Sequence, residues 1–130
     1  PDNLRVARSL HGLAVCHICQ ATTQTTKRKA LLRQAKRSLE EVLRIQILAG
    51  ERCAPADLAT TYHDLGIVLS KLGTVAHHNE ALAYFQKALS IRIDAFGSRE
   101  NLLVAETIRE IGKYFLFFSP ADADAAAAAA

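Results

Sequence analysis

The sequence predicts an all-α protein of five helices, and two observations support this prediction. Apolar residues recur at steps of three and four along most of the chain, which is the spacing of one buried helix face. Sustained alternation of apolar and polar residues is missing, as are the Asn-Gly and Asp-Gly pairs of tight hairpins. With 130 residues, the chain suits one domain that is long enough to bury a core.

Glycine and proline punctuate the helical periodicity. Gly50, Gly73 and Gly97 follow periodic segments and are typical helix stops, while Pro55 suits a first helical turn. The connections are short, as between antiparallel helices. The expected helices cover residues 3–20, 28–48, 56–72, 79–96 and 101–118.

The chain also repeats itself. LATTYHDLG (58–66) aligns with VAETIREIG (104–112), and VARSLHGLA (6–14) fits the same frame. The helices between them match as well, since AKRSLEEVLRIQI (35–47) aligns with ALAYFQKALSIRI (81–93). One hairpin cannot bury its apolar face alone, whereas stacked hairpins form a continuous core. The order A-B-A-B-A therefore predicts about two and a half stacked helical hairpins.

These positions carry a family resemblance. The first helix of each pair has a small residue after an apolar one, and Gly73 falls at the hairpin turn. Together with Ala81, Phe85 and Ala88 in the second helix, this pattern resembles the tetratricopeptide repeat (TPR). The resemblance covers residues 4–118 and implies a TPR-like superhelix.

A narrower resemblance lies within that family. SIRIDAFG (90–97), with the loop and LLVAETIREIG that follow it, is similar to the lengthened repeats of kinesin light chain. The asparagine pair usual in the first helix of those repeats is replaced here by His63-Asp64 and Arg109-Glu110.

The TPR resemblance implies a function as well as a fold. We expect a protein–protein interaction scaffold within a large complex, whose concave groove takes an extended or helical peptide of a partner protein. The resemblance places one set of first-helix residues in this groove, namely Arg8, His11, Thr60, His63, Ile67, Glu106, Arg109 and Lys113.

The stretch VCHICQ (15–20) has the spacing of half a metal site. One Cys-x-x-Cys pair supplies zinc with two ligands, whereas closed structural sites need four, and no strand precedes it as in a redox centre. In the repeat frame Cys16 and Cys19 fall on positions that packing residues fill elsewhere. We therefore expect one of these thiols to pack against the second helix of its hairpin, with no metal bound.

Other candidates for chemistry are sparse. His77-His78 is interpreted as part of a solvated loop, because adjacent histidines bind one ion with poor geometry. No nucleophile–base–acid arrangement, glycine-rich phosphate loop or pair of catalytic carboxylates can be assembled. We expect a protein that is not an enzyme, with no cofactor and no small-molecule substrate.

A basic patch lies in the second helix, where helical spacing puts Lys29, Arg33, Lys36 and Arg37 on one face. Three interpretations stay open: a solvated face, a surface for an acidic protein, or a surface for nucleic-acid phosphates. Missing aromatic residues nearby count against nucleic acid. An alternative function is thus a basic adaptor that docks on nucleic acid or on an acidic filament through helix 28–48.

Composition bounds the setting. There are 16 basic and 13 acidic residues, and the Ala-rich tail (119–130) is interpreted as filler or unassigned residues. Three cysteines is an odd count, which favours a reducing cytoplasmic setting, with cytoskeletal association as one option. No apolar run is long enough to span a membrane. We expect residues 1–118 to form one domain of a longer array, whose apolar last helix packs on another repeat or a partner.

Overall fold

The computed structural model describes residues 2–97 and 101–117, and the regular structure in these ranges is helical throughout. This confirms the all-α class and the five helices. Residue 118 of the expected fifth helix and the tail 119–130 lie outside the described residues. The α-helices are α1 (Asp2–Thr23), α2 (Arg28–Ala49), α3 (Pro55–Leu72), α4 (Val75–Phe96) and α5 (Leu102–Phe117), and two short 3-10 turns, η1 (Thr25–Lys27) and η2 (Gly50–Arg52), flank α2.

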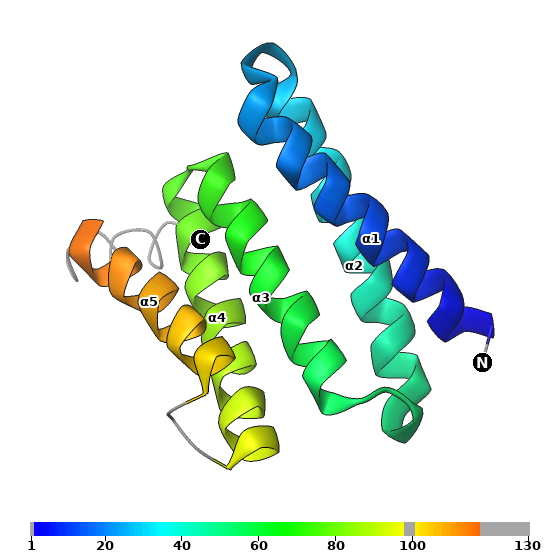
Figure 1. Cartoon of the computed structure of the whole chain (residues 1–130). Coiled ribbons are helices and arrows are strands. Elements are labelled where there is room, and N and C mark those ends of the chain that lie inside the picture. The colour runs from blue at the N-terminus through cyan, green and yellow to red at the C-terminus, as the bar shows by residue number, and fades with distance from the viewer. Residues whose placement is uncertain (1, 98–100, 118–130) are drawn as a thin grey trace.

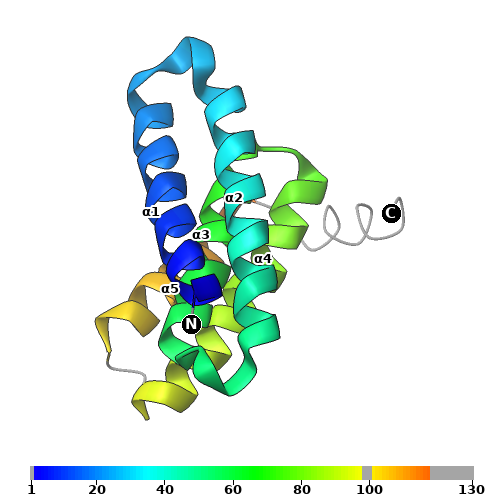
Figure 2. The same cartoon turned by 90° about the vertical axis from the view of Figure 1, so that its right-hand side faces the viewer.

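The helices form antiparallel pairs in chain order (Figure 1). α1 packs along α2, α3 packs along α4, and α5 packs on α4, while α2 joins the first pair to α3. Figure 2 shows α1 and α2 side by side along their lengths. The main partner of α1 is α2 and that of α3 is α4, which leaves α1 and α3 in looser contact with each other.

Local chemistry fixes the helix ends near the expected positions. Pro55 occupies the first turn of α3, where its missing N–H costs no hydrogen bond. Gly73 and Gly97 adopt left-handed conformations, with φ of 83° and 64°, and their N–H groups donate to the carbonyls of Leu69 and Ile93. Both are C-terminal caps that a residue with a Cβ would adopt only under strain.

The start of α4 corrects one expectation. The helix begins at Val75 rather than at residue 79, because Thr74 caps it: the hydroxyl oxygen of Thr74 accepts a hydrogen bond from the His77 N–H over 3.1 Å. His77 and His78 therefore lie in the first turn of α4, half-buried, and not in a solvated loop. The threonine cap makes the connection shorter than the sequence suggested.

The core runs between the helix pairs. One buried cluster joins α1, α2 and α3 through small and branched side chains: Ala14, Ala21, Leu32, Ala35, Leu39, Leu65 and Val68. A second joins α3 to α4 through Leu69, Ala81 and Phe85. A Cβ on Gly66 would lie 2.6 Å from a ring carbon of Phe85. Gly66 thus lets the aromatic ring lie directly on the α3 backbone.

The cysteine expectation is wrong, because Cys16 and Cys19 are both exposed. Val68, which holds the position of Cys16 in the repeat frame, is buried in the cluster that α1 and α2 share with α3. The first helix pair covers this side of α3. No helix in the described part of the chain covers the matching side of α1. The same repeat position is therefore core in α3 and surface in α1.

Candidate functional site

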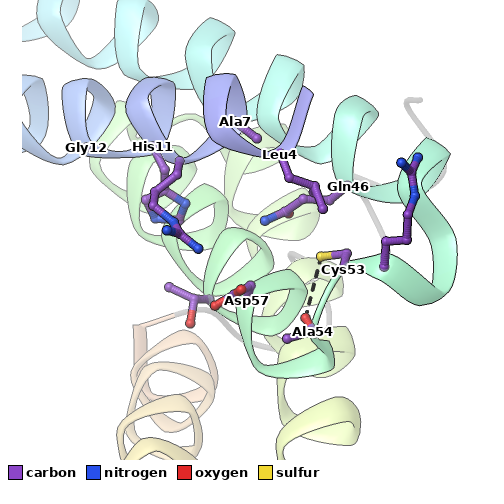
Figure 3. A pocket seen from close by; sticks show the side chains of 11 residues that line it. Leu4, Ala7, His11, Gly12, Gln46, Cys53, Ala54 and Asp57 are labelled. Atoms are coloured by element: carbon purple, nitrogen blue, oxygen red, sulfur yellow. Dashed lines mark hydrogen bonds between the residues drawn. The ribbon is translucent and has the colours of Figure 1, made fainter. Parts of the chain in front are cut away.

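A pocket of about 510 Å³ opens between α1 and the start of α3, with the end of α2 behind it. Figure 3 shows its lining side chains converging from these helices and from the segment that joins α2 to α3. Its polar lining consists of Arg8, His11, Gln46, Arg52, Cys53, Asp57 and Thr60. Three of these were expected in a groove, so the structure does bring Arg8, His11 and Thr60 together.

A hydrogen bond joins the two helices that flank the pocket. His11 Nε2 of α1 lies 2.6 Å from Asp64 Oδ2 of α3, and both side chains are about four-fifths buried. The contact links two first helices directly, although their main packing partners are the second helices. His11 therefore has a structural role as well as a place in the pocket lining.

Gln46 lies deepest among the polar residues of the pocket. It is 7% exposed, and its Oε1 is buried without a hydrogen-bond partner. Figure 3 shows this side chain reaching from α2 into the space between α1 and α3. Buried polar groups in folded proteins are nearly always hydrogen-bonded, and an unpaired one is costly. The Gln46 amide is therefore the polar group behind the pocket whose hydrogen bonding is incomplete within the described residues.

The second helix pair shows what fills the corresponding space there. Arg92 of α4 aligns with Gln46 in the repeat and is 3% exposed. Its Nη1 donates to Thr107 Oγ1 over 2.7 Å and to the Leu103 carbonyl over 3.1 Å. The same nitrogen lies 3.2 Å from His63 Nδ1. The guanidinium of Arg92 thus spans the space between α3 and α5. The shorter side chain of Gln46 leaves the equivalent space between α1 and α3 open.

The electrostatics follow from this burial. Desolvation, followed by the charge of Arg92, lowers the pKa of His63 below its ordinary value, and Asp64 opposes the shift. Desolvation likewise lowers the pKa of Arg92. His63 Nδ1 lies 3.2 Å from Arg92 Nη1 and 3.1 Å from Thr107 Oγ1, and the adjacent guanidinium disfavours the protonated ring. His63 therefore belongs to a structural network rather than to an open groove.

The other expected groove residues are dispersed. Ile67 and Lys113 line a separate hollow of about 340 Å³ among α3, α4 and α5. Glu106 is half-buried and Arg109 exposed, both on α5 and outside the two pockets. The expected row of eight residues is thus not one continuous surface. It is divided by the Arg92 network.

Sequence reasoning missed Gln46, Arg52, Cys53 and Asp57. A signal for the first was present, because Gln46 lies among core positions of α2, where a polar residue is unusual. Arg52 and Cys53 lie beyond the end of α2, where helical periodicity stops and no pattern predicts a direction, and Asp57 lies in the first turn of α3, where an acidic residue is common at any helix start. Burial raises the pKa of the Cys53 thiol, with a further contribution from Asp57, so this thiol is a weak nucleophile.

Within residues 2–97 and 101–117, no cluster of three or more His, Cys, Asp or Glu side chains could hold a metal ion. No helix in these ranges is both long and apolar enough to cross a membrane.

Comparisons with protein-family models, with curated proteins and with solved structures found no match for this chain.

Proposed function

We propose that the chain is a TPR-like helical-repeat module that acts as a non-catalytic protein–protein interaction scaffold in a larger cytoplasmic assembly. The antiparallel pairs in the order A-B-A-B-A support this proposal, and so does the close contact that Gly66 permits with Phe85. Stacked pairs of this kind leave clefts between their first helices, where a partner segment can lie.

The pocket between α1 and α3 is the observation that carries the proposal. It is open, it is lined by Arg8, His11 and Thr60, and its lining includes the amide of Gln46, whose Oε1 is buried without a partner in the described part of the chain. A primary amide can accept from a peptide N–H and donate to a peptide carbonyl. The pocket therefore suits the backbone of a partner segment, and its lining carries the positive charges of Arg8 and Arg52 and the carboxylate of Asp57.

Site-specific crosslinking tests this function. A photo-crosslinking amino acid replaces Thr60 in the pocket or, as a control, Gln86 on the exposed face of α4. We expect a defined protein adduct from position 60 and none from position 86. Gly12 lines the pocket, and a Cβ there meets no atom within 4 Å, so Gly12→Phe should block the pocket without disturbing the fold.

Gly112→Phe is the matched control for that blocking variant. Gly112 is also a glycine inside a helix with no atom within 4 Å of an added Cβ, but it lies on α5 and away from the pocket. We expect the adduct at position 60 to disappear in Gly12→Phe and to persist in Gly112→Phe. An adduct that survives Gly12→Phe, or that forms equally at position 86, would contradict partner binding in this pocket.

The last helix supports the larger assembly within this proposal. Phe115 and Leu116 of α5 are 58% and 78% exposed. Exposed apolar side chains on an end helix are poor contacts for water, and a further repeat or a partner would bury them. If the isolated chain is monomeric, soluble and cooperatively folded by sedimentation and urea denaturation, the idea that α5 needs a partner is wrong.

A further inference from the structure

The basic patch of α2 has more charge than its neighbours neutralise. Lys29, Arg33 and Arg37 are exposed, and none of the three forms an ion pair within the described ranges. Lys36 reaches Glu40, with 3.7 Å between Nζ and Oε1, which is a long contact between partly exposed groups. Such a pair contributes little, so the patch presents almost its full positive charge to solvent.

Part of this patch borders a hollow that α2 forms together with α3 and α4. It has a volume of about 250 Å³ and is lined by Arg33, Lys36, Arg37 and Glu40 of α2, Leu72 of α3 and His77 of α4. Its apolar contact is Leu72, at the end of α3. The hollow thus offers the cationic side chains of Arg33, Lys36 and Arg37 around an aliphatic one, with Glu40 as its one carboxylate, at a place where α2 lies near the α3–α4 turn.

Positive charge continues past that turn. Arg28 at the start of α2 and Lys71 near the end of α3 line the neighbouring hollow of about 340 Å³. The acidic residue of that hollow, Glu110, is already paired with Lys113, with 3.2 Å between Nζ and Oε1. The excess charge therefore extends over one end of the molecule and comes from more than one helix.

We propose that this basic end is a docking surface for an acidic amphipathic helix of a partner protein, separate from the pocket between α1 and α3. Lys29, Arg33 and Arg37 stand four residues apart on α2, which at about 1.5 Å per residue is a row with steps of about 6 Å. Carboxylates four residues apart on another helix have the same spacing. An aliphatic side chain between them reaches Leu72 in the hollow.

The lining favours such a helix over nucleic acid. No Phe, Tyr or Trp side chain of the described residues lines the hollow, whose aromatic ring is the small imidazole of His77, so bases would find little surface on which to stack. Tyr84 of α4 is stacked on Tyr62, with ring centroids 5.8 Å apart, and lies 5.9 Å from Lys87 Nζ, so its ring already has partners within the protein. The aliphatic side chain of Leu72 would also make no favourable contact with a phosphate backbone. The charge and the aliphatic lining together fit a carboxylate-bearing helix.

Fluorescence anisotropy with a synthetic probe tests this proposal. The probe is a hydrocarbon-stapled alanine-based helix of about 20 residues, a length that supports a helix. It carries Glu at every fourth position and Leu residues on the same face. A second probe has the same composition, with its Glu residues spread around the helix. We expect the first probe to bind more tightly, and its affinity to fall as salt rises.

Charge reversal on the protein completes the test. Arg33→Glu with Arg37→Glu should weaken binding of the first probe by about tenfold. Arg5→Glu with Arg109→Glu makes the same change in net charge at exposed sites outside the patch and should leave binding within about twofold. If the reversed variant misfolds by circular dichroism, Arg33→Gln with Arg37→Gln replaces it. Gly12→Phe, which blocks the other pocket, should have no effect.

Several results would overturn the proposal. Equal binding of the two probes, or equal losses in the two double variants, would mean that only net charge matters. Absence of binding at low salt would exclude the surface as an acidic-helix site. Tighter binding of a DNA duplex of about 20 base pairs, lost on reversal of Arg33 and Arg37, would assign the surface to phosphates instead.

Discussion

Arg92 Nη1 of α4 donates a hydrogen bond to Thr107 Oγ1 of α5 over 2.7 Å, and both side chains are buried. The hydroxyl of Thr107 in turn donates a hydrogen bond to the Leu103 carbonyl over 3.1 Å. A buried guanidinium without acceptors would be strongly destabilising. These bonds therefore attach α5 to α4 through a charged group. The equivalent repeat position in the first helix pair is occupied by the uncharged Gln46.

Thr107→Val should test the strength of this fastening. The substitution keeps the branched shape but removes the hydroxyl that accepts from Arg92, so a buried charged donor loses a partner. We expect a loss of about 1–3 kcal/mol in the free energy of unfolding, measured by urea denaturation.

Thr61→Val is the matched control for this experiment. Thr61 is as buried as Thr107 and also donates to the carbonyl four residues earlier, that of Asp57, over 3.2 Å, but no charged group of the described residues bonds to it. Its replacement should cost less than about 1 kcal/mol. Equal losses in the two variants would show that the Arg92 bond does not contribute to stability.

The same network predicts a pH dependence. Desolvation and then Arg92 lower the pKa of His63 below its ordinary value of 6.5, so the unfolded chain binds this proton more readily than the folded chain does. The contribution of neutral His63 to stability is complete above about pH 6.5 and decreases as the pH falls below it. Asp64, Glu110 and Glu106 oppose the shift without reversing it.

His63→Gln separates this contribution from the rest of the chain. Glutamine can still accept a hydrogen bond from Arg92 but does not titrate, so the decrease in stability between pH 7.5 and 5.5 should become shallower. His78→Gln should change that slope less, because His78, whose pKa is also lowered by burial, is less deeply buried. Urea denaturation at several pH values measures the slopes, and an unchanged slope in His63→Gln would refute the prediction.

Periodicity predicted the helices well and the surfaces less well, for a physical reason. A step of three to four residues reports which face of a helix is buried, so positions such as Leu39 and Phe85 were recognisable as core. It does not report which neighbour does the burying. Cys16 and Val68 share a repeat position, yet only Val68 has a helix pair against it.

The candidate site shows the same limit. Arg8, His11 and Thr60 were predicted from their place on first helices, and they do share a pocket. Whether a space between first helices stays open depends on the length of one side chain from the second helix. Gln46 leaves the space open and Arg92 fills it, and a repeat alignment gives both positions the same role.

Thiol reactivity should distinguish the exposed cysteines from the third one. Cys16 and Cys19 are exposed, whereas Cys53 is half-buried and its pKa is raised by burial and by Asp57. A disulfide reagent such as dithionitrobenzoate reacts with thiolates, so at neutral pH two thiols should react rapidly and one slowly. Cys53→Ser should remove the slow phase alone. A slow Cys16 would mean that this thiol is packed after all.

The last prediction concerns three glycines that lie inside helices. Gly12 of α1 and Gly112 of α5 have no atom within 4 Å of an added Cβ. Replacement by alanine should stabilise the protein by up to about 1 kcal/mol at each site, because glycine is a poor helix former.

Gly66→Ala should have the opposite sign. The new Cβ would lie 2.6 to 2.8 Å from three ring carbons of Phe85, which is 2% exposed and has little room to move. Overpacking of this kind costs about 1–3 kcal/mol, which outweighs the gain in helix propensity. Thermal and urea denaturation of the three variants measure the signs. If the second substitution Phe85→Leu makes room for the new methyl group, Gly66→Ala should be less destabilising in that background than in the parent chain. An equal cost in both backgrounds would mean that the ring does not require glycine at this position.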